Sequence, residues 1–211
     1  MSRPPHSPRH AAFTLIEMIT VIAIIAILAG LVLAINGVVQ KKSATSRADA
    51  EIRALSSAVE SYKNDNGGYP QDATLTDVLD ASLDNVMPDT SKMAASSLYL
   101  YKCLSGDTNA TGAISASKNY APDFFKPSRL FGPKDSSGKL TSVQYIMDPF
   151  GNSYGYSTAG LAVEQQYRVA LATNPSAPRP PQKGYNPTFD LFSTAGDAST
   201  PPNKAKWIKN W

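Results

Sequence analysis

The stretch that decides the fold is AAFTLIEMITVIAIIAILAGLVLA, residues 11–34 of a chain of 211 residues. It places small and polar residues ahead of an apolar run in which residues 18–35 carry no charge. This run of 18 residues reaches the lower length limit for a helix that crosses a bilayer. The sequence therefore predicts a membrane-spanning helix that begins near Phe13.

A carboxylate, Glu17, lies at the start of this apolar run. An ionised side chain at that depth costs about 2.5–3.5 kcal/mol on insertion scales, so an acid there indicates a functional role. Cleavage between Ala12 and Phe13 would create an α-amino group at a similar depth, and this cation could neutralise Glu17 of the same or a neighbouring copy. The alternative is that Glu17 lies in the headgroup layer. A secretory signal peptide is disfavoured, because Ala11 and Ala12 precede the apolar run instead of following it.

The composition excludes several classes of function. The net charge is +3 and the basic residues are scattered, so no nucleic-acid partner is expected. Cys103 is the only cysteine, which excludes an intramolecular disulfide. Both histidines, His6 and His10, precede the proposed cut. The processed chain would then lack the imidazole that most nucleophilic and zinc catalysis requires, and we do not expect an enzyme.

Residues 12–34 resemble the signal and N-terminal helix of type IV pilins and type II secretion pseudopilins, in which a small residue precedes F-T-L-I-E and a long apolar helix. The resemblance implies cleavage by prepilin peptidase between Ala12 and Phe13, N-methylation of Phe13, and use of Glu17 in filament assembly. Ala12 stands where the family usually has glycine. Ala34 stands where it commonly has proline.

The orientation in the membrane rests on this resemblance and not on charge. Basic residues flank both sides of the apolar run, Arg3 and Arg9 before it and Lys41, Lys42 and Arg47 after it. The positive-inside rule alone would favour the opposite orientation. The resemblance places the leader in the cytoplasm and the head in the periplasm, in a single-pass protein of the bacterial inner membrane.

Four segments follow from these patterns. They are a leader (1–12), a transmembrane and filament-core helix (13–40), the amphipathic half of the same helix (41–66) and a globular head (67–211). Ile52, Leu55, Val59 and Tyr62 recur at helical spacing, and the charged residues lie mostly on other faces. The sequence NDNGGYP at 64–70 ends the helix, because glycine caps helices and proline cannot continue them.

The predicted fold class is α+β and pilin-like, a long N-terminal helix packed on a small antiparallel sheet. In the head we expect a capping box, Thr74 to Asp77, that opens a short helix ending near Leu83. We also expect a helix over 93–104 and an irregular connection over 105–138. A loop over 174–187 contains five prolines and is interpreted as solvated, with a polyproline II ligand as the alternative. Predicted strands are 143–147, 153–157, 167–172 and 189–192.

Two further stretches, AVESYKNDNGGYP at 58–70 and DPFGNSYGY at 148–156, resemble the G-type major pseudopilin of type II secretion. A third, FDLFSTAGD at 189–197, resembles the start of that family's calcium loop. Calcium takes six to eight oxygen ligands, and residues 198–211 contain no acid. We therefore expect no cofactor, with a lysine bound to Asp197 and with Trp207 and Trp211 as anchors. A weak calcium site at Asp190 and Asp197 is the alternative.

The sequence thus favours a structural subunit of a type II secretion pseudopilus. Its expected partners are further copies of the chain, prepilin peptidase, the inner-membrane assembly platform and minor pseudopilins. A type IV pilin or minor pseudopilin, for adhesion, motility or DNA uptake, is the alternative within this class. The alternative from another class is an anchored binding protein or enzyme with paired acids, for which the candidates are Asp123, Asp135 and Asp148.

Overall fold

A computed structural model describes residues 13–83, 87–114, 118–197 and 199–211. The chain divides into two compact units, residues 1–43 and 44–211. Helix α1, Leu15–Asn66, begins in the first unit and ends in the second. The predicted continuous helix is confirmed. It begins at Leu15, two residues after Phe13, and ends at Asn66, the last residue of the predicted amphipathic half. Ala12 and the rest of the leader lie outside the described residues.

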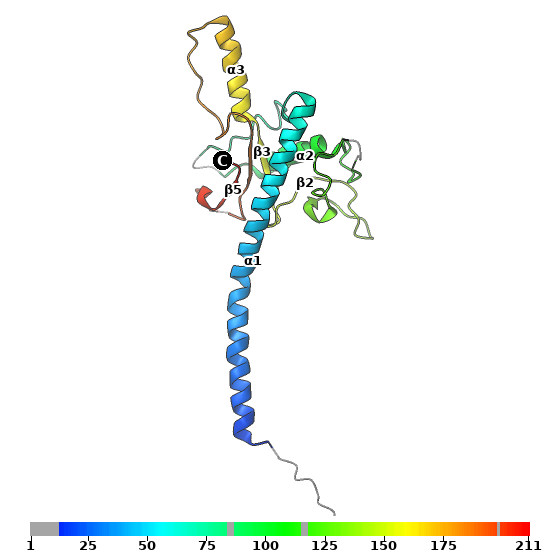
Figure 1. Cartoon of the computed structure of the whole chain (residues 1–211), viewed down its shortest axis with the longest axis vertical. Coiled ribbons are helices and arrows are strands. Elements are labelled where there is room, and N and C mark those ends of the chain that lie inside the picture. The colour runs from blue at the N-terminus through cyan, green and yellow to red at the C-terminus, as the bar shows by residue number, and fades with distance from the viewer. Residues whose placement is uncertain (1–12, 84–86, 115–117, 198) are drawn as a thin grey trace, which may run out of the picture. The chain divides into compact units, whose positions relative to one another are not determined.

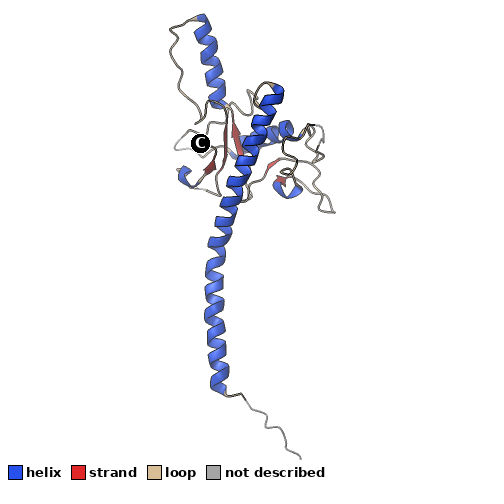
Figure 2. Cartoon of the chain, in the orientation of Figure 1, coloured by secondary structure: helices blue, strands red, loops and turns tan. Residues whose placement is uncertain are grey.

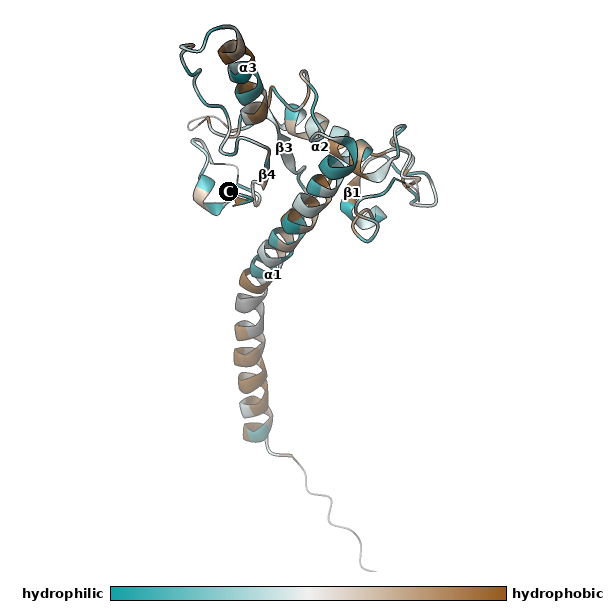
Figure 3. Cartoon of the chain, turned by 45° about the horizontal axis from the view of Figure 1, so that its top comes forward, coloured by the Kyte–Doolittle hydropathy of each residue, from teal (hydrophilic) through white to brown (hydrophobic). Residues whose placement is uncertain are grey.

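The first unit consists of an apolar helix whose described side chains are exposed on every side. The exposed fraction of its large apolar side chains up to Leu31 ranges from 46% at Met18 to 78% at Leu15. Figure 3 shows this hydrophobic stretch in the N-terminal part of α1. Within the described parts of the chain, no helix combines the length and the apolarity needed to cross a membrane. The predicted single-pass span stays a prediction.

The second unit contains two small antiparallel sheets (Figures 1 and 2). Strand β4, Asp190–Ser193, lies between β3, Gly155–Ser157, and β5, Ile208–Lys209. In this sheet Tyr156 is opposite Leu191, and Phe192 is opposite Lys209. Strand β1, Leu130–Phe131, pairs with β2, Tyr145–Ile146. The α+β, pilin-like prediction is confirmed.

The core of the second unit lies between α1, helix α2 and the sheets. Ile52, Leu55 and Val59 of α1 are at most 2% exposed, so the predicted apolar stripe is confirmed. Helix α2, Thr90–Ser105, confirms the helix expected over 93–104. The Asp89 side chain caps its start by accepting from Ser91 N and Lys92 N. Its buried apolar residues include Leu100, Tyr101 and Leu104.

The helix predicted after Thr74 is wrong, because residues 73–78 form turns. Asp72 holds this segment, and its carboxylate accepts from Thr74 N at 2.8 Å and Leu75 N at 3.0 Å. A helix does not propagate because long-range bonds occupy the groups it would need. The Thr76 carbonyl accepts from Thr158 N at 3.1 Å, and the Asp77 carboxylate accepts from the Thr158 hydroxyl at 2.6 Å.

The strand predicted over 167–172 is also wrong, since these residues belong to helix α3, Ala159–Thr173. The segment is rich in Ala, Leu, Glu, Gln and Arg, which favour helix. Glu164 and Arg168 form an i,i+4 ion pair at 3.1 Å. The other three predicted strands are present as β2, β3 and β4, whereas β1 and β5 were not predicted.

In the described residues 106–114 and 118–138, the predicted irregular connection is confirmed except for a 3₁₀ turn, Pro127–Arg129, and β1, whereas Ser105 still belongs to α2. Residues 115–117 lie outside the described residues. A second 3₁₀ turn is Lys204–Lys206. Within this connection, Phe124 and Phe125 are buried. Phe131 is 42% exposed and stacks on Tyr145 at 4.6 Å between ring centroids.

Candidate functional site

The N-terminal site begins with a capping box at the first turn of α1. The Glu17 carboxylate accepts from Thr14 N at 2.8 Å and from the Thr14 hydroxyl at 2.7 Å. In return, Thr14 Oγ1 accepts from Glu17 N at 3.3 Å. This reciprocal arrangement satisfies backbone donors that the start of a helix otherwise leaves unpaired. Thr14 therefore ends the non-helical segment, and α1 starts directly after it.

Phe13 and Glu17, both predicted from the sequence, lie in one short segment at the start of α1. Phe13, which is 74% exposed, directly precedes Thr14 and lies outside the helix. The predicted scissile bond between Ala12 and Phe13 precedes the cap residue. Thr14 is not among the residues predicted for the site, although the T-x-x-E spacing at 14–17 is the pattern of a capping box. Glu17 therefore has a partner within its own chain, and that partner is neutral.

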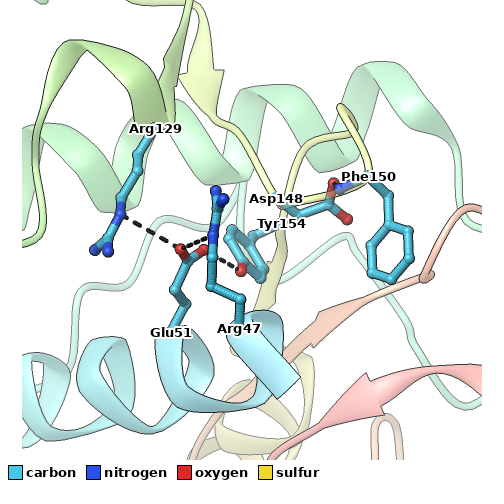
Figure 4. A network of polar contacts seen from close by, with 6 residues as sticks. All are labelled: Arg47, Glu51, Arg129, Asp148, Phe150 and Tyr154. Carbon is cyan, nitrogen blue, oxygen red and sulfur yellow. Dashed lines mark hydrogen bonds and ion pairs between the residues drawn. The ribbon is translucent and has the colours of Figure 1, made fainter. Parts of the chain in front are cut away.

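A second carboxylate, Glu51, lies in the head and is 3% exposed. It accepts from Arg47 Nε at 3.1 Å, Arg129 Nε at 3.3 Å and the Tyr154 hydroxyl at 2.8 Å (Figure 4). The helical pattern predicts that the charged residues lie mostly on faces other than the apolar stripe, and Glu51 is an exception because it is buried. Two guanidinium groups and one hydroxyl compensate the cost of burying the carboxylate. Burial, together with the charge of Glu51, raises the pKa of Tyr154, so its hydroxyl stays a donor.

The residues of the DPFGNSYGY stretch serve the folding of the head. Asp148, 2% exposed, accepts from Phe150 N at 2.9 Å and Asn152 N at 2.8 Å, and also from the Ser193 hydroxyl. Burial raises the pKa of Asp148, and these hydrogen bonds oppose the rise. Asp148 thus closes the turn, and Tyr154 from the same segment binds Glu51 of α1 (Figure 4). The motif joins the turn to the helix.

The three acids considered for catalysis do not form a common site. Asp135 accepts from Ser137 N at 2.8 Å and Lys139 N at 3.0 Å within its own turn. Asp148 closes a different turn. Asp123 lines a hollow of about 360 Å³ beside Arg129. The described contacts therefore support separate structural roles for Asp135 and Asp148.

The two carboxylates proposed for calcium, those of Asp190 and Asp197, accept hydrogen bonds in the structure, and the calcium site stays a prediction. Asp190 accepts from Tyr185 N at 2.8 Å and Asn186 N at 2.9 Å, and Asp197 accepts from the Ser199 hydroxyl at 2.7 Å and Asn203 N at 2.6 Å. Each carboxylate is thus occupied by hydrogen-bond donors of its own loop. Within the described ranges, no three His, Cys, Asp or Glu residues form a metal-binding group. The hydroxyl and backbone donors lower the pKa of Asp197 to about 2.

Aromatic packing anchors the C-terminal loop. Trp207 is 4% exposed and stacks on Phe192 at 5.2 Å between centroids, and Trp211 stacks on Tyr185 at 4.4 Å. Both predicted anchors are confirmed. A lysine was expected to bind Asp197. In the structure the Lys204 ammonium donates to the Ala81 carbonyl at 2.9 Å and the Tyr185 hydroxyl at 3.2 Å.

Comparison with known protein families finds a match at the N-terminal segment. A family model described as the prokaryotic N-terminal methylation motif matches residues 7–33. This motif indicates a type IV pilin-like or pseudopilin protein that is processed by prepilin peptidase, carries a methylated N-terminus and is anchored in the membrane. No curated protein and no solved structure matches the chain. The finer assignment to the G-type major pseudopilins stays a prediction.

Proposed function

We propose that this chain is a structural subunit of a type II secretion pseudopilus, assembled through its N-terminal helix to support protein export. The observation that carries the proposal is the first unit, in which Glu17 stands at the start of a helix with apolar side chains exposed on all sides. Burial of apolar surface contributes about 25 cal/mol per Å². Such a helix requires lipid around it before assembly and neighbouring helices after assembly.

Charge determines the register between subunits in this proposal. In the single chain, Glu17 is bonded to the neutral donors of Thr14. Cleavage before Phe13 frees an α-amino group, and that cation on a neighbouring copy is the opposite charge that Glu17 lacks in its own capping box. Opposite charges in an environment of low dielectric constant attract strongly. The ion pair would form only where two helices are aligned at this depth.

The head supports the proposal because its buried carboxylates are bonded to groups of the head itself. Glu51, Asp148 and Asp190 are buried and hydrogen-bonded. Asp148 and Asp190, which lie in stretches that carry the family resemblance, thus maintain the fold of the head. Its role in the filament would be an outer layer around the helices. Further partners, the inner-membrane platform, prepilin peptidase and minor pseudopilins, belong to this proposal.

Glu17→Gln is the sharpest test of the proposal. The amide oxygen of glutamine can still accept from Thr14, but the side chain carries no charge, so the helix start is kept while the ion pair is lost. We expect the variant to be inserted and stable but to form no filaments in electron micrographs, and to export the secreted protein poorly. Glu60→Gln, on the same helix and half exposed, should assemble normally. Normal filaments from Glu17→Gln would refute the charge mechanism.

The second candidate is a type IV pilin or minor pseudopilin, and helix α3 favours it. Residues 159–187 add a helix and a proline-rich return to the head, which makes the chain longer than a compact major subunit requires. Disruption of the gene separates the two candidates. Loss of protein export supports the pseudopilus, whereas loss of adhesion, motility or DNA uptake with export intact supports the alternative.

A further inference from the structure

The turn after α2 contains the one stretch of the sequence that matches the acceptor pattern for N-linked glycosylation. This pattern is Asn-x-Ser/Thr, in which x is any residue except proline, and NAT at 109–111 fits it. The stretches NPS at 174–176 and NPT at 186–188 have the same spacing, but proline stands in the middle of each. The other asparagines of the chain have neither Ser nor Thr two positions later. The sequence thus offers a single candidate, Asn109.

The structure places the Asn109 side chain on the surface without an internal partner. Asn109 is exposed and lies in a turn, and within the described parts of the chain its side chain makes no hydrogen bond. The two asparagines that precede proline differ. Asn174 Oδ1 accepts from Ser176 N at 3.0 Å, and Asn186 Nδ2 donates to the Phe189 carbonyl at 3.1 Å. The Asn109 amide can therefore carry a substituent without loss of a contact in the head.

The backbone on both sides of Asn109 is fixed to the head. The Asp107 carboxylate accepts from Gly112 N at 2.7 Å, and its carbonyl accepts from Ala110 N at 3.1 Å. Ala110 has a φ of 54°, and its carbonyl accepts from Val143 N at 2.7 Å. Asp107 and Ala110 are each 6% exposed. These buried neighbours close the turn and leave Asn109 at its outer side.

The hydroxyl residue of the pattern is also accessible. Thr111 is exposed. Its hydroxyl donates to Asp107 Oδ1 at 3.4 Å and accepts from Ala113 N at 3.3 Å. Both distances are longer than the usual range for such hydrogen bonds, so these contacts are weak and can be exchanged for contacts with an enzyme. A transferase can reach both side chains of the acceptor from the solvent.

We propose that Asn109 is a site of N-linked glycosylation, an inference that rests on the periplasmic location of the head in the proposed function. Glycosylated asparagines of this pattern lie in surface loops of exported proteins, and Asn109 lies in such a loop. A glycan at this position adds a bulky and solubilising group to the surface of the head.

The donor is an oligosaccharide that is linked through pyrophosphate to a polyprenyl lipid. Asn109 Nδ2 forms a bond to the anomeric carbon of the first sugar, while the bond from that carbon to the pyrophosphate oxygen breaks. The polyprenyl diphosphate leaves with the bonding electrons, and a base of the transferase takes the proton from Nδ2. The membrane anchor that the N-terminal motif indicates keeps the acceptor beside a bilayer that would contain such a lipid.

Mass spectrometry of the native protein tests the inference. Trypsin cleaves after Lys102 and Lys118, so Asn109 lies in the peptide 103–118. We expect this peptide to carry sugar, and electron-transfer fragmentation to locate the sugar on Asn109. An unmodified peptide, or sugar on a Ser or Thr of it, in chains that begin at N-methylated Phe13 would overturn the inference and leave the proposed function standing. Unmodified chains that retain Met1 would contradict both.

Three variants provide an independent readout, the intact mass of the protein. Asn109→Gln removes the acceptor at an exposed position, and we expect complete loss of the glycan mass. Thr111→Ser keeps the pattern and should keep the glycan. Asn203→Gln makes the same exchange at another exposed asparagine that lies outside the pattern, and it should also keep the glycan. A glycan mass that persists in Asn109→Gln would refute the assignment, because the sugar would then be attached elsewhere.

Discussion

The partners of the carboxylates and the exposure of the apolar side chains differ between the two units of the chain. In the head, Glu51 has two arginines and a tyrosine as partners, and the apolar residues of α1 are buried. In the first unit, Glu17 has only the neutral donors of Thr14 among its described contacts, and the apolar side chains are exposed. The buried carboxylates of the head have their partners within the head, whereas the first unit leaves its apolar side chains exposed. This difference supports the proposal that residues 13–43 mediate assembly.

The largest expected effect separates the two units directly. Ile25→Lys places a charge in the apolar helix, at a position 59% exposed. A lysine at the centre of a membrane helix costs about 2.5–3.5 kcal/mol on insertion scales. We expect assembly to be abolished while the thermal unfolding midpoint of the head, measured in detergent, stays unchanged.

The conservative control for that change is Ile25→Leu, which keeps the residue apolar and should assemble like wild type. A shift of the head's thermal unfolding midpoint in Ile25→Lys would contradict this difference between the two units. It would show that the head depends on the first unit for its stability.

The next effect concerns the buried carboxylate of the head. Glu51→Ala leaves Arg129 and the Tyr154 hydroxyl without their partner, and breaking a buried ion pair from one side costs about 3–5 kcal/mol. Because Arg47 is 56% exposed, we expect the lower end of that range. Chemical denaturation followed by circular dichroism measures it. In Asp49→Ala, where the lost pair with Arg53 is exposed, the change should stay below about 1 kcal/mol.

A smaller effect sharpens the description of the head's core. In Gly155→Ala, the added Cβ would lie 2.3 Å from the Phe192 ring, which is fully buried. Overpacking of this kind costs about 1–3 kcal/mol. Gly68→Ala is the matched control, because its Cβ would meet nothing within 4 Å. Equal unfolding free energies for the two variants would mean that the sheet adapts to the added methyl group.

The smallest effect is a local response to acid in the C-terminal loop. Hydrogen bonds from Ser199 hold the pKa of Asp197 at about 2, below its ordinary value. Ionised Asp197 therefore stabilises the loop above about pH 4, and this contribution is lost as the pH falls toward 2. Burial raises the pKa of Asp148 and of Asp190, so their protonation acts in the opposite direction.

Fluorescence of the buried Trp207 reports on this loop. We expect a change between pH 4 and 2 in the wild-type protein that is absent in Asp197→Asn, whose side chain does not titrate. If both proteins show the same change, another group controls the loop.

Local sequence patterns predicted the parts of the fold that depend on local chemistry. The helical spacing of Ile52, Leu55 and Val59 predicted the buried face of α1. The processing and assembly residues around Phe13 and Glu17 could be predicted because they lie in one continuous segment. The wrong and missing predictions concern segments whose structure depends on residues distant in the sequence. Thr158 takes the hydrogen bonds that a helix after Thr74 would have needed, and Ile208–Lys209 becomes a strand because it lies beside β4.

The same distinction between local and distant contacts explains which residues of the candidate sites were not predicted. Thr14 could have been found from its spacing to Glu17, since a capping box is local. The burial of Glu51 could not, because Arg129 and Tyr154 are 78 and 103 residues away in sequence. A segment of two apolar residues, such as Leu130 and Phe131, is too short to show the hydrophobic periodicity that distinguishes a strand from a loop.

In the proposed assembly, Glu17 forms an ion pair with the α-amino group of a neighbouring copy, and this group exists only after cleavage before Phe13. The most direct measurement is the intact mass and N-terminal sequence of the native protein extracted from membranes. We expect a chain that begins at N-methylated Phe13. A chain that retains Met1, or one cut after the apolar run, would contradict it, because Glu17 would then have no terminal amine to pair with.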